Sequence, residues 1–343
     1  MNIDFFDTSN KVFIIAELSA NHGHDIAIAK KTIDAVKDSG ADAIKLQTYR
    51  ADTLTIDCNN DYFKLDIGTI WDGRTLYDLY SEAYTPWEWH EELMDYANRL
   101  GLIFFSSPFD KTAADFLEGL NVPAYKIASF ELMDIPLIEY IASKGKPMIM
   151  STGVASLSEI CDAVVSCRRM NNNQIMLMKC TSSYPAKVED ANLLMIPNMK
   201  ETFEVEVGLS DHTLGITAPI VSIALGARAI EKHFILDKSI GGPDSSFSLE
   251  PDEFKKMVDS VREAEKALGK INYNLESTQK NRLIGRSLFV VEDVEEGEIF
   301  TENNIRSIRP GYGLPPKYIK NILGKKAKNN IKRGTPLNWD LIT

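Results

Sequence analysis

Eight short apolar runs recur along the first two thirds of the chain, and segments of helical period separate them. The runs lie at residues 13–18, 43–48, 102–107, 124–129, 147–152, 175–180, 205–210 and 229–234. Their apolar residues are nearly continuous, which is typical of strands buried on both faces of a parallel sheet. Eight strand–helix units in about 260 residues predict a (β/α)8 TIM barrel. An open doubly wound sheet is the alternative, but it seldom needs eight such regular units.

The pattern changes after residue 270. Residues 271–285 are polar and predict a linker, and residues 286–343 combine short strands with turns. A weak internal repeat relates residues 291–305 to residues 328–342. It matches Gly297 with Gly334, Ile305 with Ile342, Val294 with Ile331 and Phe300 with Leu337. We therefore predict a barrel at 1–270 and a small, pseudo-symmetric β-rich domain at 286–343.

Composition argues against several classes of protein. The net charge of −11 disfavours nucleic-acid binding, because phosphate backbones require a basic surface. No apolar run approaches the roughly 18 residues of a membrane span. The N-terminal residues lack a secretion leader, and the four cysteines lack metal-finger spacing. We expect a cytoplasmic protein with reduced thiols and with neither a nucleic-acid nor a membrane partner.

Polar side chains end all eight predicted strands. Parallel strands of a barrel end at one mouth, where TIM barrels place their active sites. Unpaired buried charges cost several kcal/mol each, so stability alone is a poor explanation for such a set. Its members are Glu17, Lys45, Gln47, Ser106, Ser107, Lys126, Ser129, Glu131, Ser151, Thr152, Lys179, Thr181, Ser182, Tyr184, Ser210, Asp211, His212, Lys232 and His233.

Two of the five histidines, His212 and His233, end neighbouring predicted strands. Two neutral imidazoles without a nearby cysteine leave most coordination positions to water and substrate oxygen. Such a site suits octahedral Mn²⁺ or Mg²⁺ better than a closed zinc site. A satisfied core histidine would explain either residue alone, but the pair favours metal ligation.

The remaining strand-end residues suggest an anion site with acid–base chemistry. Lys45, Lys126 and Lys179, with several serines, predict a rim of cations and hydroxyl donors suited to phosphate and carboxylate groups. A Schiff-base lysine remains an alternative. Glu17 and Glu131 are the candidate acid–base pair, although a simple ion pair with lysine explains Glu17 equally well.

The chain resembles the sialic acid synthase family along essentially its whole length. The matching motifs are FIIAELSANH, GADAIKLQTY, FFSSPFD, AYKIASFE, MSTG, KCTSSYP, VGLSDHT, IEKHF, GGPDSSFS and SIRPGYGL, in this order. The resemblance implies that the C-terminal segment is an antifreeze-like (SAF) domain. It also implies a homodimer in which this domain acts as a lid over the partner's barrel.

The resemblance further implies a reaction and a set of roles. The family condenses phosphoenolpyruvate with the aldehyde of an N-acylated amino sugar and releases phosphate. Mn²⁺ is the expected ion, with Mg²⁺ or Co²⁺ as alternatives, held by His212 and His233. Glu131 would be the base for water addition, and Glu17 would act at the aldehyde. Phosphoenolpyruvate contacts would be Lys45, Ser107, Lys126, Ser129, Ser151, Ser182 and Ser210; sugar contacts would be Gln47, Tyr184, Asp244 and Arg309, the last from the partner subunit.

The sequence departs from the N-acetylneuraminate synthases at three places. Ser182 replaces their usual asparagine, and His24 stands where glycine is usual. The insertion at 70–93, with Trp71, resembles the pseudaminic acid synthase branch, which acts on 2,4-diacetamido-2,4,6-trideoxy-L-altrose. The additional methyl and acetamido groups of that sugar favour an apolar, aromatic wall. N-acetylneuraminate synthesis, legionaminate synthesis and a non-catalytic sugar-binding barrel are the alternatives.

Overall fold

The computed structural model describes residues 11–66, 68–273 and 276–343. These residues form two compact units, of which the first ends at Gly269 and the second begins at Lys270. Among the described residues, no helix has both the length and the apolar character that crossing a bilayer requires.

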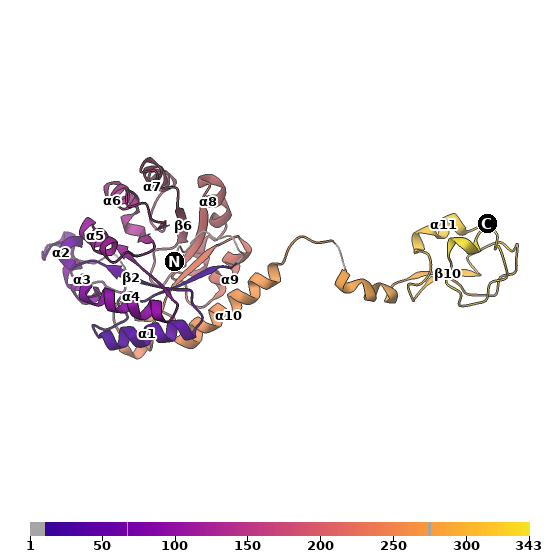
Figure 1. The fold of residues 1–343 in the computed structure, drawn as a ribbon, viewed down its shortest axis with the longest axis horizontal. Coiled ribbons are helices and arrows are strands. Elements are labelled where there is room, and N and C mark those ends of the chain that lie inside the picture. The colour runs from indigo at the N-terminus through magenta and orange to yellow at the C-terminus, as the bar shows by residue number, and fades with distance from the viewer. Residues whose placement is uncertain (1–10, 67, 274–275) are drawn as a thin grey trace. The chain divides into compact units, whose positions relative to one another are not determined.

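Eight parallel strands of the first unit close into a barrel, in which each strand pairs with its sequence neighbours and β8 pairs with β1 (Figure 1). The predicted TIM barrel is therefore confirmed. Strand β4 has only three residues, because the chain turns into a 3₁₀ helix at Ser129. The strands are β1 (Phe13–Glu17), β2 (Ala43–Thr48), β3 (Ile103–Pro108), β4 (Tyr125–Ile127), β5 (Met148–Ser151), β6 (Ile175–Cys180), β7 (Glu206–Asp211) and β8 (Ala229–His233).

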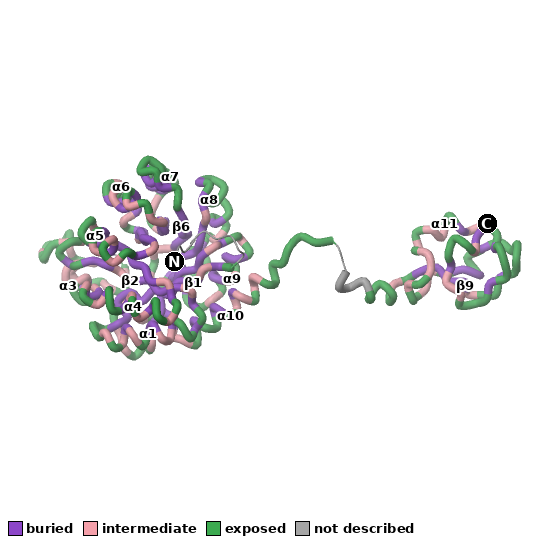
Figure 2. The backbone as a smooth tube through the Cα atoms, viewed as in Figure 1, coloured by how far each residue is buried: buried purple, intermediate pink, exposed green. Residues whose placement is uncertain are grey.

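Helices pack around the outside of the strands and bury one face each, while their outer faces remain exposed (Figure 2). Side-chain caps define several helix starts: Asp25 accepts a hydrogen bond from Ala27 N, and Ser156 and Glu159 form a capping box. The covering helices are α1 (Ile26–Asp38), α4 (His90–Arg99), α5 (Lys111–Gly119), α6 (Ile135–Ala142), α7 (Leu157–Arg169), α8 (Met195–Phe203), α9 (Thr217–Ala224) and α10 (Pro251–Leu268).

Short additional elements follow the C-terminal ends of four strands. The longest insertion follows β2 and contains two helices and two 3₁₀ turns. These elements are α2 (Ala51–Leu54), η1 (Asp61–Phe63), α3 (Leu76–Ala83) and η2 (Trp87–Trp89) after β2, η3 (Ser129–Met133) after β4, η4 (Val188–Ala191) after β6, and η5 (Lys238–Ile240) and η6 (Ser245–Phe247) after β8.

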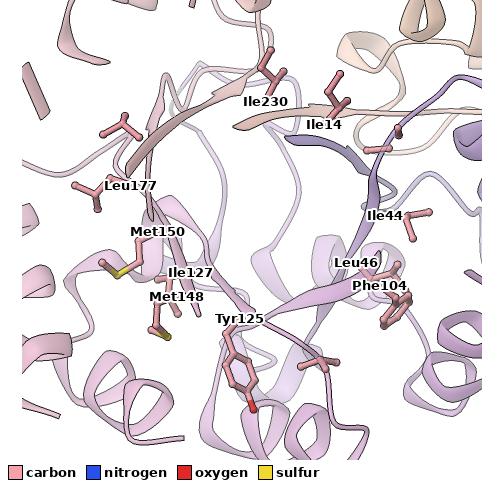
Figure 3. Packing of buried hydrophobic residues seen from close by; sticks show 14 of the residues in the cluster. Ile14, Ile44, Leu46, Phe104, Tyr125, Ile127, Met148, Met150, Leu177 and Ile230 are labelled. Atoms are coloured by element: carbon pink, nitrogen blue, oxygen red, sulfur yellow. The ribbon is translucent and has the colours of Figure 1, made fainter. Parts of the chain in front are cut away.

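Side chains alternate along each strand between the barrel interior, here called the lumen, and the layer beneath the helices. Ile14, Ile44, Leu177 and Ile230 belong to the outer layer and surround the ring of strands (Figure 3). A separate apolar cluster fills the lower lumen. It consists of Ile15, Ala43, Phe105, Ala124, Ile149, Met176, Met178 and Ala229. The next inward position on each strand is therefore the floor of the mouth.

The second unit follows the repeat seen in its sequence. Strands β9 (Ser287–Val290) and β10 (Ile305–Ile308) pair antiparallel. Val294 and Ile331, which are equivalent positions 37 residues apart, exchange backbone hydrogen bonds of 2.9 and 2.8 Å. The amides of Gly297 and Gly334 donate to the carbonyls of Ala327 and Val290 in the same way. The two half-motifs are thus related by a local pseudo-two-fold. The other elements are η7 (Glu276–Ile284), within the predicted linker, and η8 (Pro316–Tyr318), α11 (Ile319–Ile322) and η9 (Trp339–Leu341).

The packing of the lumen predicts that Gly208→Ala destabilises the barrel. A Cβ at Gly208 would lie 2.6 Å from Met178 Sδ and 2.7 Å from the Ala229 carbonyl oxygen. We expect a loss of about 1–3 kcal/mol, measured by chemical denaturation. Gly119→Ala is the control, because no atom lies within 4 Å of that Cβ. An unchanged stability of Gly208→Ala would contradict this account of the lumen.

Candidate active site

A lysine held between two carboxylates forms the centre of the mouth. Lys45 Nζ lies 2.7 Å from Glu17 Oε2 and 3.5 Å from Glu231 Oε1, and it donates to Ser107 Oγ at 3.3 Å. Burial raises the pKa of Glu17 to about 7, opposed by Lys45 and reinforced by Glu231. The pKa of Lys45 is raised, because the two carboxylates outweigh the effect of burial. This arrangement lets Glu17 hold or release a proton near neutral pH.

A second group of donors lies at the ends of β4, β5 and β6. Lys126 donates to Ser151 Oγ at 2.6 Å, and burial lowers the pKa of this lysine. Gly153 N donates to Ser129 Oγ at 3.2 Å. A Cβ at Gly153 would lie 2.2 Å from Ser182 Oγ and 3.0 Å from Ser129 Oγ, so the backbone approaches these hydroxyls as only glycine permits. The group is a compact set of neutral and cationic donors.

Lys179 does not join this group. Leu177 lies in the outer layer and Met178 in the lumen, so the alternation along β6 turns Lys179 away from the lumen. Its ammonium donates to the Cys180 carbonyl at 2.6 Å and to Thr181 Oγ1 at 3.2 Å. The predicted rim of three lysines is therefore wrong: Lys45 and Lys126 are its two lysines.

The two strand-end histidines lie side by side, with ring centroids 5.3 Å apart. His212 Nδ1 lies 3.0 Å from the Thr181 carbonyl oxygen. In the neutral ring, that contact places the proton on Nδ1 and leaves the lone pair on Nε2. Among the described residues, His233 Nδ1 is buried without a hydrogen-bond partner. Burial lowers the pKa of His233 well below its usual value, and the neighbouring cations add to this effect. His212 differs: burial lowers its pKa, but Cys180, whose Sγ lies 3.8 Å from Nδ1, and the Thr181 carbonyl outweigh burial and raise the pKa. His233 is therefore the neutral member of the pair, and the expectation that no cysteine lies near the histidines is wrong.

Three predicted sugar contacts gather beside the histidines. Gln47 Nε2 donates to Glu17 Oε1 at 3.1 Å and to Ser19 Oγ at 3.0 Å. Ser19 in turn donates to Asp244, whose carboxylate is 3.9 Å from His233 Nδ1.

The third of these residues, Tyr184, packs on His212 and Phe247. Its ring lies 4.4 Å from that of His212 and 5.2 Å from that of Phe247. Arg309, the fourth predicted sugar contact, follows β10 in the second unit.

Glu131 lies in η3, directly after β4. Its Oε2 is buried and has no hydrogen-bond partner within the described part of the chain. Burial raises the pKa of Glu131 to about 7, although Lys126 acts in the opposite direction. A buried carboxyl group with one unpartnered oxygen and a pKa near 7 suits a general base.

The insertion after β2 covers one side of the mouth. Trp71 Nε1 donates to the Pro243 carbonyl at 3.0 Å, and the Trp71 ring lies 5.4 Å from that of Tyr184. Tyr80 of α3 packs against Tyr49 with their centroids 5.8 Å apart. The insertion therefore supplies an aromatic wall next to the predicted sugar contacts.

His22 and His24 connect the loop after β1 to this wall. His24 Nε2 lies 2.7 Å from the Glu82 carbonyl oxygen, and His22 Nε2 lies 3.1 Å from Thr85 Oγ1. His24 has φ of 56°, the left-handed conformation that favours glycine. The loop thus keeps a glycine-like backbone conformation at His24, while the His24 side chain contacts the end of α3.

Comparison with known proteins identifies the protein family or domain type to which each unit is similar. Residues 32–273 match the NeuB family and residues 285–343 match the SAF domain. The chain belongs to the NeuB family. A pseudaminic acid synthase of Helicobacter pylori is 50% identical over 95% of this chain and 96% of its own length. A pseudaminic acid synthase of Campylobacter jejuni is 49% identical over 98% of both chains.

More distant relatives agree with the NeuB assignment. An N,N'-diacetyllegionaminic acid synthase of Legionella pneumophila is 37% identical over 98% of this chain and 96% of its own. The crystal structure of an N-acetylneuraminic acid synthetase from Leptospira borgpetersenii superposes with a TM-score of 0.71 at 34% identity, covering 79% of this chain and 90% of that one. The predicted family and its two-domain architecture are confirmed.

Two groups of this NeuB-family site were absent from the residues predicted for it. Glu231 precedes His233 by two positions and therefore faces the lumen with it, which strand alternation could have indicated. Ser19 bridges Gln47 and Asp244 from a loop, and no sequence pattern marks that contact.

The raised pKa of Glu131 predicts a pH-dependent effect of Glu131→Gln on stability. The folded-state pKa is about 7 against the ordinary glutamate value of 4.5, so the stabilisation from Glu131 is complete below pH 4.5 and is lost as pH rises through 7. The melting temperature of Glu131→Gln relative to wild type should therefore be higher at pH 8 than at pH 5, in metal-free buffer.

Glu159→Gln is the matched control for this measurement. The pKa of Glu159 is lowered by its hydrogen bonds to Ser156, so its carboxylate is ionised at both pH values and its effect should not change between them. An equal shift for Glu131→Gln at the two pH values would mean that Glu131 is already ionised at pH 5.

Proposed function

We propose that this enzyme condenses phosphoenolpyruvate with 2,4-diacetamido-2,4,6-trideoxy-L-altrose to give pseudaminic acid and phosphate. The observation that carries the proposal is its identity of 49–50% with pseudaminic acid synthases over nearly the whole chain, against 37% with a legionaminic acid synthase. The aromatic wall after β2 supports the same sugar, because a methyl group and a second acetamido group bind better to apolar surface than to hydroxyl partners.

Lys126 and its neighbours suit the phosphoenolpyruvate. Among the described residues, Lys126 forms no ion pair, and burial lowers its pKa. A bound phosphate or carboxylate would supply the missing negative charge and would stabilise the ammonium form. Ser129, Ser151 and Ser182 add hydroxyl donors on rigid strand ends, which require little reorganisation.

We assign a divalent cation to His212 and His233. The unpartnered Nδ1 of His233 and the free Nε2 of His212 fit nitrogen ligation. In the part of the chain that the structure describes, no three His, Cys, Asp or Glu side chains form a group that could hold a metal ion, so the protein side of the site would be the two histidines. Two nitrogen donors with positions left for oxygen fit Mn²⁺ first, with Mg²⁺ or Co²⁺ as alternatives. Such an ion would polarise the sugar aldehyde as a Lewis acid.

The carboxyl groups of the mouth supply the proton transfers. C3 of phosphoenolpyruvate attacks the aldehyde carbon, and Glu17 gives the new alkoxide its proton. C2 becomes an oxocarbenium ion, to which water adds while Glu131 accepts a proton. The C2 hydroxyl of this tetrahedral intermediate then loses its proton to the departing phosphate as the C–O bond breaks and the ketone forms. The pKa of about 7 for both carboxyl groups suits proton exchange at neutral pH.

A homodimer with Arg309 acting on the partner's sugar is part of the proposal. Large exposed apolar side chains stand on the loops after β4 to β7, which supports an assembly surface around the mouth. They are Phe130, Met133, Leu157, Leu194 and Leu214. We also expect the enzyme to act in the cytoplasm, where phosphoenolpyruvate is available.

The reaction predicts Mn²⁺-dependent phosphate release from phosphoenolpyruvate. The L-altro sugar, its legionaminate-pathway counterpart and N-acetylmannosamine are assayed in parallel. We expect turnover with the L-altro sugar and its loss on addition of chelator. Turnover with another sugar alone would contradict the choice of sugar. Borohydride trapping of a lysine adduct, insensitive to chelator, would indicate a Schiff-base aldolase instead.

The aromatic wall predicts that Trp71→Ala lowers kcat/KM for the L-altro sugar by roughly tenfold or more, since lost apolar contact with a substrate group is worth at least this much. The KM for phosphoenolpyruvate should change little, because Trp71 contacts Tyr184 and Pro243 and not the lysines. Tyr62→Ala is the control, since Tyr62 lies in the same insertion and is 93% exposed. Equal effects on the two substrates would place Trp71 outside the sugar site.

A further inference from the structure

A buried ion pair joins β7 and β8 directly beside the two histidines. Lys232 Nζ donates to Asp211 Oδ2 and to the Thr213 carbonyl oxygen, the latter at 2.6 Å. Asp211 and Lys232 are register partners across the two strands. Asp211 immediately precedes His212, and Lys232 immediately precedes His233. The pair therefore connects the two strand ends that carry the histidines.

The pair faces away from the lumen and cannot touch substrate there. Ile230 belongs to the outer layer, and Lys232 has the same parity along β8, opposite to that of Glu231 and His233. The side chains of Lys232 and Asp211 are 0% and 2% exposed. The pair therefore acts on the site without touching substrate in the lumen: through the backbone of the strand ends and through the electrostatic effect of its charges on the two histidines.

Stability alone is a poor reason for this ion pair. Desolvating two charges costs several kcal/mol, and well-packed apolar residues in such positions are often neutral or better. The surrounding outer layer is apolar, so an apolar pair would suit its packing. The ion pair instead restricts geometry. An ammonium group with two fixed oxygen partners determines the relative position of the two strand ends.

Hydrogen bonds fix the backbone around His212. Asp211 Oδ1 accepts from Thr213 N at 3.0 Å while Lys232 donates to the Thr213 carbonyl, so both backbone polar groups of the residue after His212 are bonded to the pair. On the other side, Ala186 N donates to the His212 carbonyl at 2.9 Å. The His212 backbone is thus fixed from β8 and from the segment after β6.

We infer that the Asp211–Lys232 pair is a positioning device for the divalent-cation site, because it fixes the separation of the strand ends that carry His212 and His233. The inference rests on the proposed function for the identity of the ligands. Groups that orient metal ligands without touching the metal commonly change its affinity 10- to 100-fold.

Mn²⁺ titration of the full-length, metal-free protein, followed by electron paramagnetic resonance of the free ion, tests the inference. We expect Lys232→Met to raise the Mn²⁺ dissociation constant by about tenfold or more. At saturating Mn²⁺, its kcat should approach that of wild type, because Lys232 touches no reacting group. Lys200→Met is the control: it removes an ion pair with Glu206 at the opposite end of β7 and should leave Mn²⁺ affinity unchanged.

Two further variants separate positioning from stability. Asp211→Asn keeps an oxygen acceptor for Lys232, so it should fold even if Lys232→Met does not, and it should weaken Mn²⁺ binding by a smaller factor. The double variant Asp211→Asn with Lys232→Met leaves no unpaired charge. Weak Mn²⁺ binding by the double variant, with a melting temperature close to wild type, would support positioning.

Two results would overturn the inference and are distinguishable. Wild-type Mn²⁺ affinity in Lys232→Met, Asp211→Asn or the double variant would show that the pair does not position the site. Absence of Mn²⁺ binding by the wild-type protein itself would remove the cation site from the proposed function, and the inference would fall with it.

Discussion

Mutual neutralisation of Lys45, Glu17 and Glu231 is the interaction on which the mouth of the barrel depends. All three side chains are buried, and any one of them left alone would be an uncompensated charge. Together they carry one positive and up to two negative charges. The raised pKa of Glu17, about 7, lets this carboxyl group hold a proton and so reduces the excess negative charge. Gln47, Ser107 and Ser210 are positioned by hydrogen bonds to this triad, so the geometry of the mouth follows from it.

The alternation of side chains along the strands separates the residues that line the mouth from the residues that face the helix layer. The lower lumen is filled with apolar side chains, so substrates enter and leave only at the mouth. Two residues further along the strands, the same inward side carries Glu17, Lys45, Ser107, Lys126, Ser151, Ser210 and Glu231. The outward positions beside them carry the ion pair of Asp211 and Lys232. Charges that face the mouth and charges that face the helix layer thus occupy opposite sides of the same strands.

The sequence predicted the barrel because continuous apolar runs leave few alternatives, and every predicted run overlaps a strand to within one residue at its C-terminal end or contains it. It also predicted that Glu17, Lys45, Lys126, His212 and His233 would meet, since parallel strands share one mouth. It did not predict the side of the strand on which Lys179 lies. An apolar run locates the end of a strand, but it does not show which side chains at that end face the lumen. The contacts of Ser19 and His24 were out of reach for another reason: loop conformation depends on distant partners such as Asp244 and Glu82.

The local two-fold of the C-terminal unit makes its two half-motifs depend on each other. Each half-motif supplies the carbonyl groups that the glycine amide of the other half requires, and Val294 and Ile331 satisfy each other. Neither half can complete its own backbone hydrogen bonds. A free half-motif would find the same partners on a second copy of itself, as in a symmetric homodimer. The C-terminal unit thus has, within one chain, the backbone hydrogen-bond pattern of a symmetric dimer.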